Sequence, residues 1–364
     1  MLRLPRTFIC QLCFNRSVDM TSSPASIRVK FSHWLGAFTG FYRPSASEIR
    51  QLDTVSKFLY AARSVILVIS AQAAIIAGLL AAQAGAFHWL HFILVFIGFV
   101  TAHMISNLSN DYFGYKYGHD TPDSPRMRYT VHPLNSGVLS PRTLLLGIVI
   151  TAVLGLSILT FFILERGWLA AGFASAGIVL LFWYDAVPVS LKSIGLGELA
   201  VFIVWGPLMV GGGYAVISGH FASDAIYIAT PYGLGVMSIL LGKHIDQREF
   251  DTSKAIHTLP VLLGEHAARV INILVILMMY IIIAVLIILQ LLTPFAAVTL
   301  IALPRASHAL HTLSRARPTQ APEGYVGWPL WYHRVCLQHN RAFGWLYILG
   351  LTLGVLWSTV VAHA

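Results

Sequence analysis

The sequence predicts an all-α membrane protein in which about nine transmembrane helices form a bundle around a central cavity. The chain has 364 residues, of which 57% are hydrophobic and only 11% are charged. Its mean hydropathy is +0.72. Soluble proteins carry roughly 25% charged residues, whereas a membrane-spanning helix needs about 20 mostly apolar residues. We therefore expect the lipid bilayer to surround most of this chain.

Apolar runs of the required length follow one another along the chain, separated by proline, glycine or charged segments. The eighth run is short, and the aromatic, amphipathic stretch 325–340 is an alternative eighth span or an interfacial helix. Residues 1–57 are expected to form a cytosolic N-terminal tail, and residues 58–364 the membrane domain. The nine runs are 58–83, 88–107, 142–164, 167–184, 196–218, 226–243, 266–290, 291–304 and 342–362.

The first residues of the tail are basic but lack the long apolar run of a secretory signal. They fit a plain cytosolic tail best. Two other interpretations stay open, which are a weak mitochondrial presequence and a non-native start upstream of Met20.

The charge distribution orients the predicted bundle. The net charge is +9, from 24 Lys and Arg against 15 Asp and Glu. If the first run starts on the cytosolic side, the opposite loops hold only Arg166, and cytosolic loops typically carry the basic excess. We therefore predict a multi-pass integral membrane protein with its N-terminus in the cytosol or matrix and no nucleic-acid partner. The cytosolic loops would hold Lys116, Arg126, Arg128, Arg142, Lys192, Lys243, Arg248, Lys254, Arg305, Arg315, Arg317, Arg334 and Arg341.

The acidic residues gather on the same predicted side of the membrane. Nine of the 15 lie in the stretches 107–142, 184–198 and 243–265, which follow the second, fourth and sixth runs. Charged groups at the ends of membrane helices are costly and usually functional. These nine are Asp111, Asp120, Asp123, Asp185, Glu198, Asp246, Glu249, Asp251 and Glu265.

The first acidic stretch, NLSNDYFGYKYGHD at 107–120, has the oxygen ligands that Mg²⁺ prefers. Asn107, Asn110 and Asp111 share one face of a helix, being spaced i, i+3 and i+4. Asp120 follows after two glycines that allow the chain to turn back. Because Mg²⁺ usually takes one or two carboxylates together with substrate phosphate, this stretch is a candidate metal site. The alternative is an ordinary polar helix cap.

The second stretch, KHIDQREFDTSK at 243–254, ends the sixth run in a similar way. It contains Asp246, Glu249 and Asp251 between basic residues suited to phosphate. Alone, it would be a charged helix end. Two such clusters on one membrane face can hold a diphosphate through Mg²⁺, which neutralises the leaving group so that an allylic C–O bond ionises.

Several ordered motifs in the chain resemble those of the UbiA superfamily of intramembrane prenyltransferases. NDYFGYKYGHD followed by HPLNSGVLS is similar to the first Asp-rich motif and the "RPL-x-SG-x-x-S" stretch of that family. The later GLGE at 195–198, GPL at 206–208 and the segment from Asp251 to Gly264 resemble the menaquinone and vitamin-K branch most. The resemblance implies a nine-helix bundle around a central cavity that opens to lipid, with a diphosphate site at its cytosolic end.

Carried over residue by residue, the resemblance implies a site built from two Mg²⁺ clusters, with Asp111 and Asp246 as the catalytic carboxylates. It implies that Asn107, Asn110, Asp111 and Asp120 hold the first Mg²⁺, and Asp246 and Asp251 the second. The candidate diphosphate partners are Arg63, Lys116, Arg128, Lys192 and Lys254. Tyr112 and Tyr184 are candidates to face a carbocation through cation–π attraction.

The chain departs from the family pattern at two positions and in one spacing. The Asp expected four residues after the "ND" asparagine is Gly114, and the Arg of "RPL" is His132. The acids of the second motif are five residues apart instead of four, a spacing that an undistorted helix does not align.

The resemblance implies a Mg²⁺-dependent transfer of a prenyl group from a polyprenyl diphosphate to an aromatic, quinone-precursor-like acceptor within the membrane. A terpene cyclase of the same superfamily is the first alternative, because of the departures at Gly114 and His132. A cation or proton transporter is the second. Transporters place acids inside their spans, often near mid-membrane, whereas runs 142–164 and 266–290 are nearly free of charge away from their ends.

Overall fold

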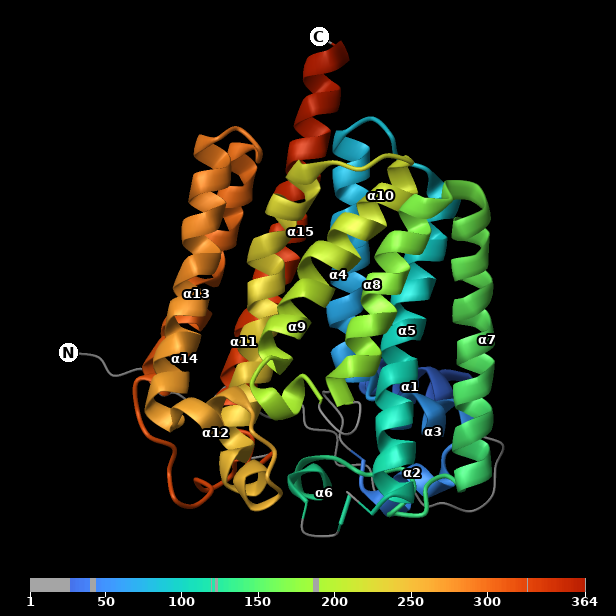
Figure 1. The fold of residues 1–364 in the computed structure, drawn as a ribbon, viewed down its shortest axis with the longest axis vertical. Helices are drawn as coiled ribbons and strands as arrows, with labels where there is room; N and C mark the ends of the chain where they lie inside the picture. The colour runs from blue at the N-terminus through green and yellow to red at the C-terminus, as the bar shows by residue number, and fades with distance from the viewer. Residues whose placement is uncertain are drawn as a thin grey trace, which may run out of the picture.

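The computed structural model describes residues 27–39, 44–118, 120–121, 124–185, 190–325 and 327–363, and all regular secondary structure in these ranges is helical. Long helices lie side by side, and short helices gather at one end of the bundle (Figure 1). The helices are α1 (Ile27–Thr39), α2 (Ala46–Gln51), α3 (Thr54–Ala61), α4 (Ser64–Gln83), α5 (Trp89–Lys116), α6 (Pro125–Tyr129), α7 (Pro141–Arg166), α8 (Trp168–Asp185), η1 (Lys192–Ile194), α9 (Gly197–Ile203), η2 (Val204–Gly211), α10 (Gly212–Ser218), α11 (Ser223–Ser253), α12 (Leu259–Leu263), α13 (Glu265–Ile288), η3 (Pro294–Ala302), α14 (Leu303–Leu313) and α15 (Tyr332–His363).

The helical membrane architecture predicted from the sequence is confirmed. Within the described residues, seven helices are long and apolar enough to cross a membrane, namely α4, α5, α7, the continuous rod α9–η2–α10, α11, α13 and α15. The shorter apolar helix α8 and the rod formed by η3 and α14 bring the described set to about the nine expected. The chain is an integral, multi-pass membrane protein.

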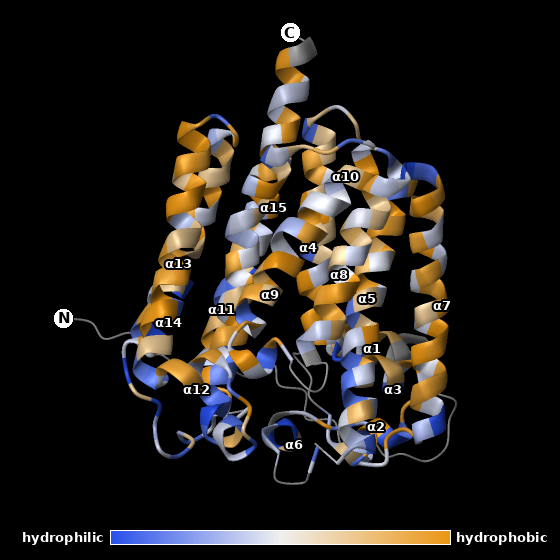
Figure 2. Cartoon of the chain, in the orientation of Figure 1, coloured by the Kyte–Doolittle hydropathy of each residue, from blue (hydrophilic) through white to orange (hydrophobic). Residues whose placement is uncertain are grey.

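The outer helices expose apolar side chains along their length. On α7, Leu146, Ile150 and Val153 are each about 60% exposed, which would be unfavourable in water and suits lipid. The central helices α4 and α11 are instead mostly buried. Hydrophobic residues cover the length of the bundle, whereas hydrophilic residues concentrate at the end that carries α6 and α12 (Figure 2).

The first predicted span, 58–83, is broken in the structure near its start. Helix α3 ends at Ala61 and α4 begins at Ser64, with Arg63 between them in the left-handed conformation at φ 55°. The Asn107 side chain of α5 donates a hydrogen bond of 3.0 Å to the Ala62 carbonyl that the break exposes. A non-glycine residue at positive φ is uncommon and often functional. The break turns the Arg63 side chain toward the end of α5.

The predicted eighth run, 291–304, is helical from Pro294 on. The 3₁₀ helix η3 ends at Ala302, and α14 continues it as far as Leu313. Nine residues at about 2.0 Å and eleven at about 1.5 Å give a combined length of about 34 Å, of which the apolar part up to Pro304 makes up about 21 Å. The stretch 325–340 is neither a span of its own nor a separate interfacial helix, because the last helix, α15, begins at Tyr332 and continues through it.

The part of the expected tail that the structure describes is helical and packs on the bundle. Helix α1 contacts α3 and α4. The Trp34 indole donates a hydrogen bond of 3.1 Å to Ser56 Oγ, and Arg50 donates one of 3.0 Å to the Ser136 carbonyl. Residues 1–26 lie outside the described residues, so the interpretations of the first residues stay predictions.

The rod α9–η2–α10 approaches α11 through backbone contact. Eight residues from Val204 to Gly211 form a π-helical turn around Pro207, which has no N–H to donate. At this level Gly206 faces Gly233 of α11, and a Cβ added to Gly233 would lie 2.9 Å from the Gly206 Cα. Small residues at such crossings let membrane helices pack closely.

Gly233→Ala is expected to destabilise the fold, because the added methyl group meets backbone atoms that have little freedom to move. The cost should be about 1–3 kcal/mol, measured as a lower melting temperature in detergent. The matched control is Gly172→Ala on α8, where no neighbouring atom lies within 4 Å of the added Cβ. Equal melting temperatures for the two variants would contradict this account of the crossing.

Candidate functional site

A buried carboxylate at the end of α5 is held between two arginines. Asp111 is 1% exposed and pairs with Arg63, which the break between α3 and α4 brings to it. Arg126, on the short helix α6, donates from Nη2 to Asp111 Oδ2 at 2.9 Å and from Nε to Oδ1 at 3.3 Å. A buried carboxylate is stable only when it is paired and hydrogen-bonded, and here both oxygens are. Three segments of the chain therefore meet at the Asp111 side chain.

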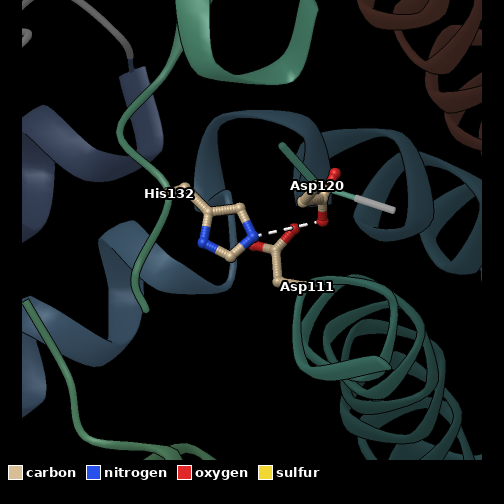
Figure 3. Close-up of side chains that lie close together, drawn as sticks. All are labelled: Asp111, Asp120 and His132. Atoms are coloured by element: carbon tan, nitrogen blue, oxygen red, sulfur yellow. Dashed lines mark hydrogen bonds and ion pairs between the residues drawn. The ribbon is translucent and has the colours of Figure 1, made fainter. Parts of the chain in front are cut away.

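A second carboxylate and a histidine lie beside Asp111. Single ligand atoms of Asp111, Asp120 and His132 all lie within 4.8 Å of one another. Figure 3 shows the three side chains converging, with an interaction of 3.2 Å between His132 Nε2 and Asp120 Oδ2. The arrangement brings together two of the four predicted ligands of the first Mg²⁺, Asp111 and Asp120.

The histidine at the position of the family arginine acts as a hydrogen-bond donor. The backbone N–H groups of Leu134 and Asn135 donate to His132 Nδ1 at 3.3 and 3.2 Å. Because Nδ1 accepts these bonds, we assign the ring proton that faces Asp120 to Nε2, which donates to it. His132 thus orients the Asp120 carboxylate beside Asp111.

Gly114, the other departure from the family pattern, makes room for Asp120. A Cβ at Gly114 would lie 2.1 Å from Asp120 Oδ2, so only glycine allows this carboxylate to rest against α5. The Asp120 N–H also donates to the Gly114 carbonyl at 3.1 Å, and Gly118 turns the chain at φ 71°. A carboxylate from the following loop thereby reaches the helix face from which the family's second Asp is missing.

A second polar cluster lies at the end of α11. Asp251 is 3% exposed and accepts a hydrogen bond of 3.3 Å from Thr258 Oγ1. His244 lies seven residues earlier on the same face of the helix and pairs with Glu198 of α9, Nδ1 to Oε1, at 2.8 Å. Lys192 and Lys243 are the cations near Asp251. Within the described part of the chain, His244 Nε2 and Glu198 Oε2 are buried and have no hydrogen-bond partner.

Asp246 does not join this cluster. Helix α11 is uninterrupted from Ser223 to Ser253, so Asp246 and Asp251 are about 140° apart around its axis. Both oxygens of Asp246 accept backbone N–H groups at the start of α15, from Tyr332 at 3.0 Å and from His333 at 2.9 Å. The Asp246 carboxylate therefore caps the last helix of the bundle.

The other predicted site residues differ in how deeply they are buried and in what they contact. Asn107 is buried at the break before α4, as described above, and Asn110 is exposed. Tyr112 packs on a small apolar cluster with helices α2 and α3, and the Tyr184 ring lies 3.3 Å from the position of a Cβ on Gly197, beside Glu198. Lys192 is half-buried near Asp251. The side chains of Lys116, Arg128 and Lys254 are exposed.

The sequence prediction missed Arg126 as the partner of Asp111. It favoured Arg128, which is two residues away and so lies about 200° around the same helix. Pro125 could have indicated this difference. Proline is favoured at the first position of a helix, and within a helix Arg126 and Arg128 point to different faces. The second group that it left out of the site is the buried pair of Glu198 and His244.

Comparison with known proteins gives a family and two kinds of relative. The model of the UbiA prenyltransferase family matches residues 71–331. The UbiA prenyltransferase domain-containing protein 1 of Dictyostelium discoideum is 25% identical over 180 residues, which are 47% of this chain and 52% of that protein. The 1,4-dihydroxy-2-naphthoate octaprenyltransferase of Haemophilus influenzae is 28% identical over 193 residues, 50% of this chain and 61% of that protein. The matches thus cover between half and two-thirds of each relative.

Solved structures share the fold. The structure described as digeranylgeranylglyceryl phosphate synthase superposes with a TM-score of 0.53 at 16% identity, covering 84% of this chain and 99% of that one. A UbiA homolog from Archaeoglobus fulgidus, bound to GPP and Mg²⁺, has a TM-score of 0.52 at 12% identity, over 82% of this chain and 99% of that one. These likenesses support the helical bundle.

Asp246→Ala is expected to destabilise the protein without weakening its metal site. Removal of the carboxylate leaves two N–H groups of α15 without their acceptor, which should cost about 1–3 kcal/mol and lower the melting temperature. Binding of Mn²⁺, followed by electron paramagnetic resonance, should stay as in the wild type. Glu249→Ala, at an exposed acid on the same helix, is the control. A variant with normal stability and lost Mn²⁺ binding would make Asp246 a metal ligand instead.

Gly114→Ala is expected to weaken metal binding while the fold stays intact. The methyl group displaces the Asp120 carboxylate from His132. Loss of a hydrogen bond that orients a metal ligand typically lowers metal affinity about 10- to 100-fold. Alanine is a good helix former, so the melting temperature should not fall because of helix propensity. Gly155→Ala, whose added Cβ meets its nearest neighbours at an ordinary 3.6 Å, is the matched control for the same Mn²⁺ titration. Equal Mn²⁺ affinities in both variants would exclude this role for Gly114.

Proposed function

Because the chain belongs to the UbiA prenyltransferase family, we propose that it transfers a prenyl group from a polyprenyl diphosphate, held through Mg²⁺, to an aromatic acceptor within the membrane. The observation that carries this proposal is the cluster at the end of α5, where Asp111 and Asp120 lie together with Arg63 and Arg126. Carboxylate oxygens suit Mg²⁺, and guanidinium groups suit diphosphate. The donor set therefore fits both the metal and the substrate.

The two clusters take different parts in this proposal. Asp111 and Asp120 would hold Mg²⁺ at the end of α5, with Asn107 and Asn110 as the further predicted oxygen donors. At the end of α11, Asp251 is the carboxylate for a second Mg²⁺, and Lys192 the nearby cation for phosphate. Asp246 contributes indirectly, because its cap positions α15 against α11.

The side chains of the site would bind and orient the diphosphate. Arg63 and Arg126 already converge on one carboxylate, so a phosphate oxygen bound beside that carboxylate would meet two donors that it holds in place. Within the described residues, Arg126 Nη1 and the neighbouring Ser124 Oγ are buried without a hydrogen-bond partner, and both can donate to such an oxygen. Bound Mg²⁺ would neutralise the charge that develops on the leaving diphosphate. The chain's arginines would add to this stabilisation.

We place the acceptor among quinone precursors. The support is the similarity of the later motifs to the menaquinone and vitamin-K branch, and the name of the Haemophilus influenzae relative, which acts on 1,4-dihydroxy-2-naphthoate. The basic loops at the end that carries the clusters support an orientation in which the site faces the cytosol or the matrix. The partners in this proposal are a polyprenyl diphosphate, an aromatic acceptor and the lipid bilayer.

The direct test gives the purified protein geranylgeranyl diphosphate, Mg²⁺ and 1,4-dihydroxy-2-naphthoate in lipid nanodiscs. Mass spectrometry should detect a prenylated dihydroxynaphthalene, or the naphthoquinone that air oxidation forms from it, and formation of this product should stop on addition of EDTA. A cyclic hydrocarbon formed without acceptor would replace transfer by terpene cyclisation. Absence of any diphosphate release with a panel of prenyl chain lengths and aromatic acceptors would reject the proposal.

Arg126→Gln is expected to lower kcat/KM for the prenyl diphosphate about 10- to 100-fold, because hydrogen bonds to charged groups are the strong ones. Asp111→Asn should lower kcat about 100- to 1000-fold, since it removes a charged oxygen ligand of the Mg²⁺ that would stabilise the leaving diphosphate. The control is Arg142→Gln, at an exposed arginine on the same side of the membrane, which should keep full activity. Full activity of Arg126→Gln would remove Arg126 from the site.

A further inference from the structure

A basic seam runs between α14 and α15, away from the two acidic clusters. Arg305, His308 and Thr312 share one face of α14, at i, i+3 and i+7. Their counterparts on α15 are Arg334, Gln338 and Arg341, at i, i+4 and i+7. The two helices are in contact, and they run in opposite directions along the bundle (Figure 1). We call these six residues the basic seam.

The lower part of the basic seam encloses a cavity. Its volume is about 370 Å³, and four of its lining residues, His308, Thr312, Arg334 and Gln338, belong to the seam. The loop after α14 closes it with aromatic rings, of which Tyr325 lies 4.9 Å beneath the Arg334 guanidinium. Aromatic side chains of this kind are enriched where a membrane protein meets the headgroups.

The upper part of the seam carries positive charge without a matching carboxylate. Arg305 lies one turn beyond His308 on α14, and Arg341 lies one turn beyond Gln338 on α15. The antiparallel helices therefore bring the two arginines to a similar level above the cavity, where their like charges repel each other. No ion pair with a carboxylate is found for either of them within the described part of the chain. The exposed Glu323, on the loop, is the acidic side chain that lines the cavity. Two positive charges held close together favour the binding of an anion.

The upper part of the seam lies at the boundary between apolar and polar sequence. Arg305 directly follows the apolar run 291–304, and Arg341 directly precedes the apolar run 342–362. Beyond them, toward the middle of the bundle, the outer surfaces are apolar. Ile301 on η3, which leads into α14, is 68% exposed, and Trp345 and Leu349 on α15 are 47% and 45% exposed. Positive charge below an apolar surface matches an amphiphile with an anionic head.

We propose that the basic seam binds the phosphate headgroup of an anionic phospholipid, whose acyl chains lie along the exposed apolar residues above it. The site is independent of the proposed prenyl transfer. Arg305 and Arg341 would contact the phosphate, and Gln338 and His308 the glycerol part of the headgroup. The bound lipid would relieve the repulsion between the two arginines and tie the last two membrane rods together.

The experiment is native mass spectrometry of the full-length protein with phosphatidylglycerol or phosphatidylcholine added to the detergent. Wild-type protein should retain phosphatidylglycerol in preference to phosphatidylcholine. The double variant Arg305→Gln/Arg341→Gln should bind phosphatidylglycerol about thirtyfold more weakly. Arg142→Gln/Arg315→Gln removes the same charge from exposed positions outside the seam and should bind as the wild type does.

A charge-conserving variant separates binding from folding. Arg305→Lys/Arg341→Lys should keep most of the preference for phosphatidylglycerol, and the melting temperatures of both double variants in lipid-free detergent should match the wild type or exceed it. Inorganic phosphate at millimolar concentration should not displace the lipid. The proposal is overturned if the glutamine variant keeps full binding, if the control loses as much, or if free phosphate competes effectively.

Discussion

The arrangement of the site depends on one buried carboxylate. Asp111 is 1% exposed, and its stability requires that Arg63 and Arg126 both reach it. Arg63 can do so only because the chain breaks between α3 and α4, where it adopts the left-handed conformation. Arg126 can do so only because α6 folds beneath the end of α5. Removing either arginine would leave an incompletely paired charge inside the protein, which is among the most costly changes to a fold.

The same residue type has two uses at the ends of two helices, α5 and α11. Asp111 faces guanidinium groups and a second carboxylate, a setting that suits a metal and phosphate. Asp246 faces the N-terminus of α15, where its oxygens accept two backbone N–H groups. Both are buried acids at the same end of the bundle, and only their partners distinguish a candidate ligand from a helix cap.

The departures from the family pattern are related to one another in the structure. Gly114 lacks a side chain, Asp120 fills the space that results, and His132 donates a hydrogen bond to Asp120. Read singly, glycine in place of aspartate and histidine in place of arginine suggested a change of reaction. Together they keep a second carboxylate beside Asp111, which supports metal binding at this position and weakens the reason for which a cyclase was the first alternative.

Hydropathy and charge along the chain were sufficient to predict the helical membrane bundle, its approximate number of spans and the helix ends that carry acids, because these properties depend on local composition. They also predicted the helix over the second motif, since the apolar run of α11 continues directly into it. The i, i+5 spacing of its acids already indicated that Asp246 and Asp251 diverge on a regular helix.

The partners of the charged groups were decided by the tertiary structure alone. The choice of Arg126 over Arg128 depends on how α6 is rotated, and the cap on α15 joins residues 86 apart in the chain. The eighth apolar run likewise continues as helix α14 to Leu313, past the end of the run, where α14 packs on α13 and α15. A sequence pattern determines which face of a helix is polar. It does not determine which neighbouring element that face meets, because this depends on the packing of the whole bundle.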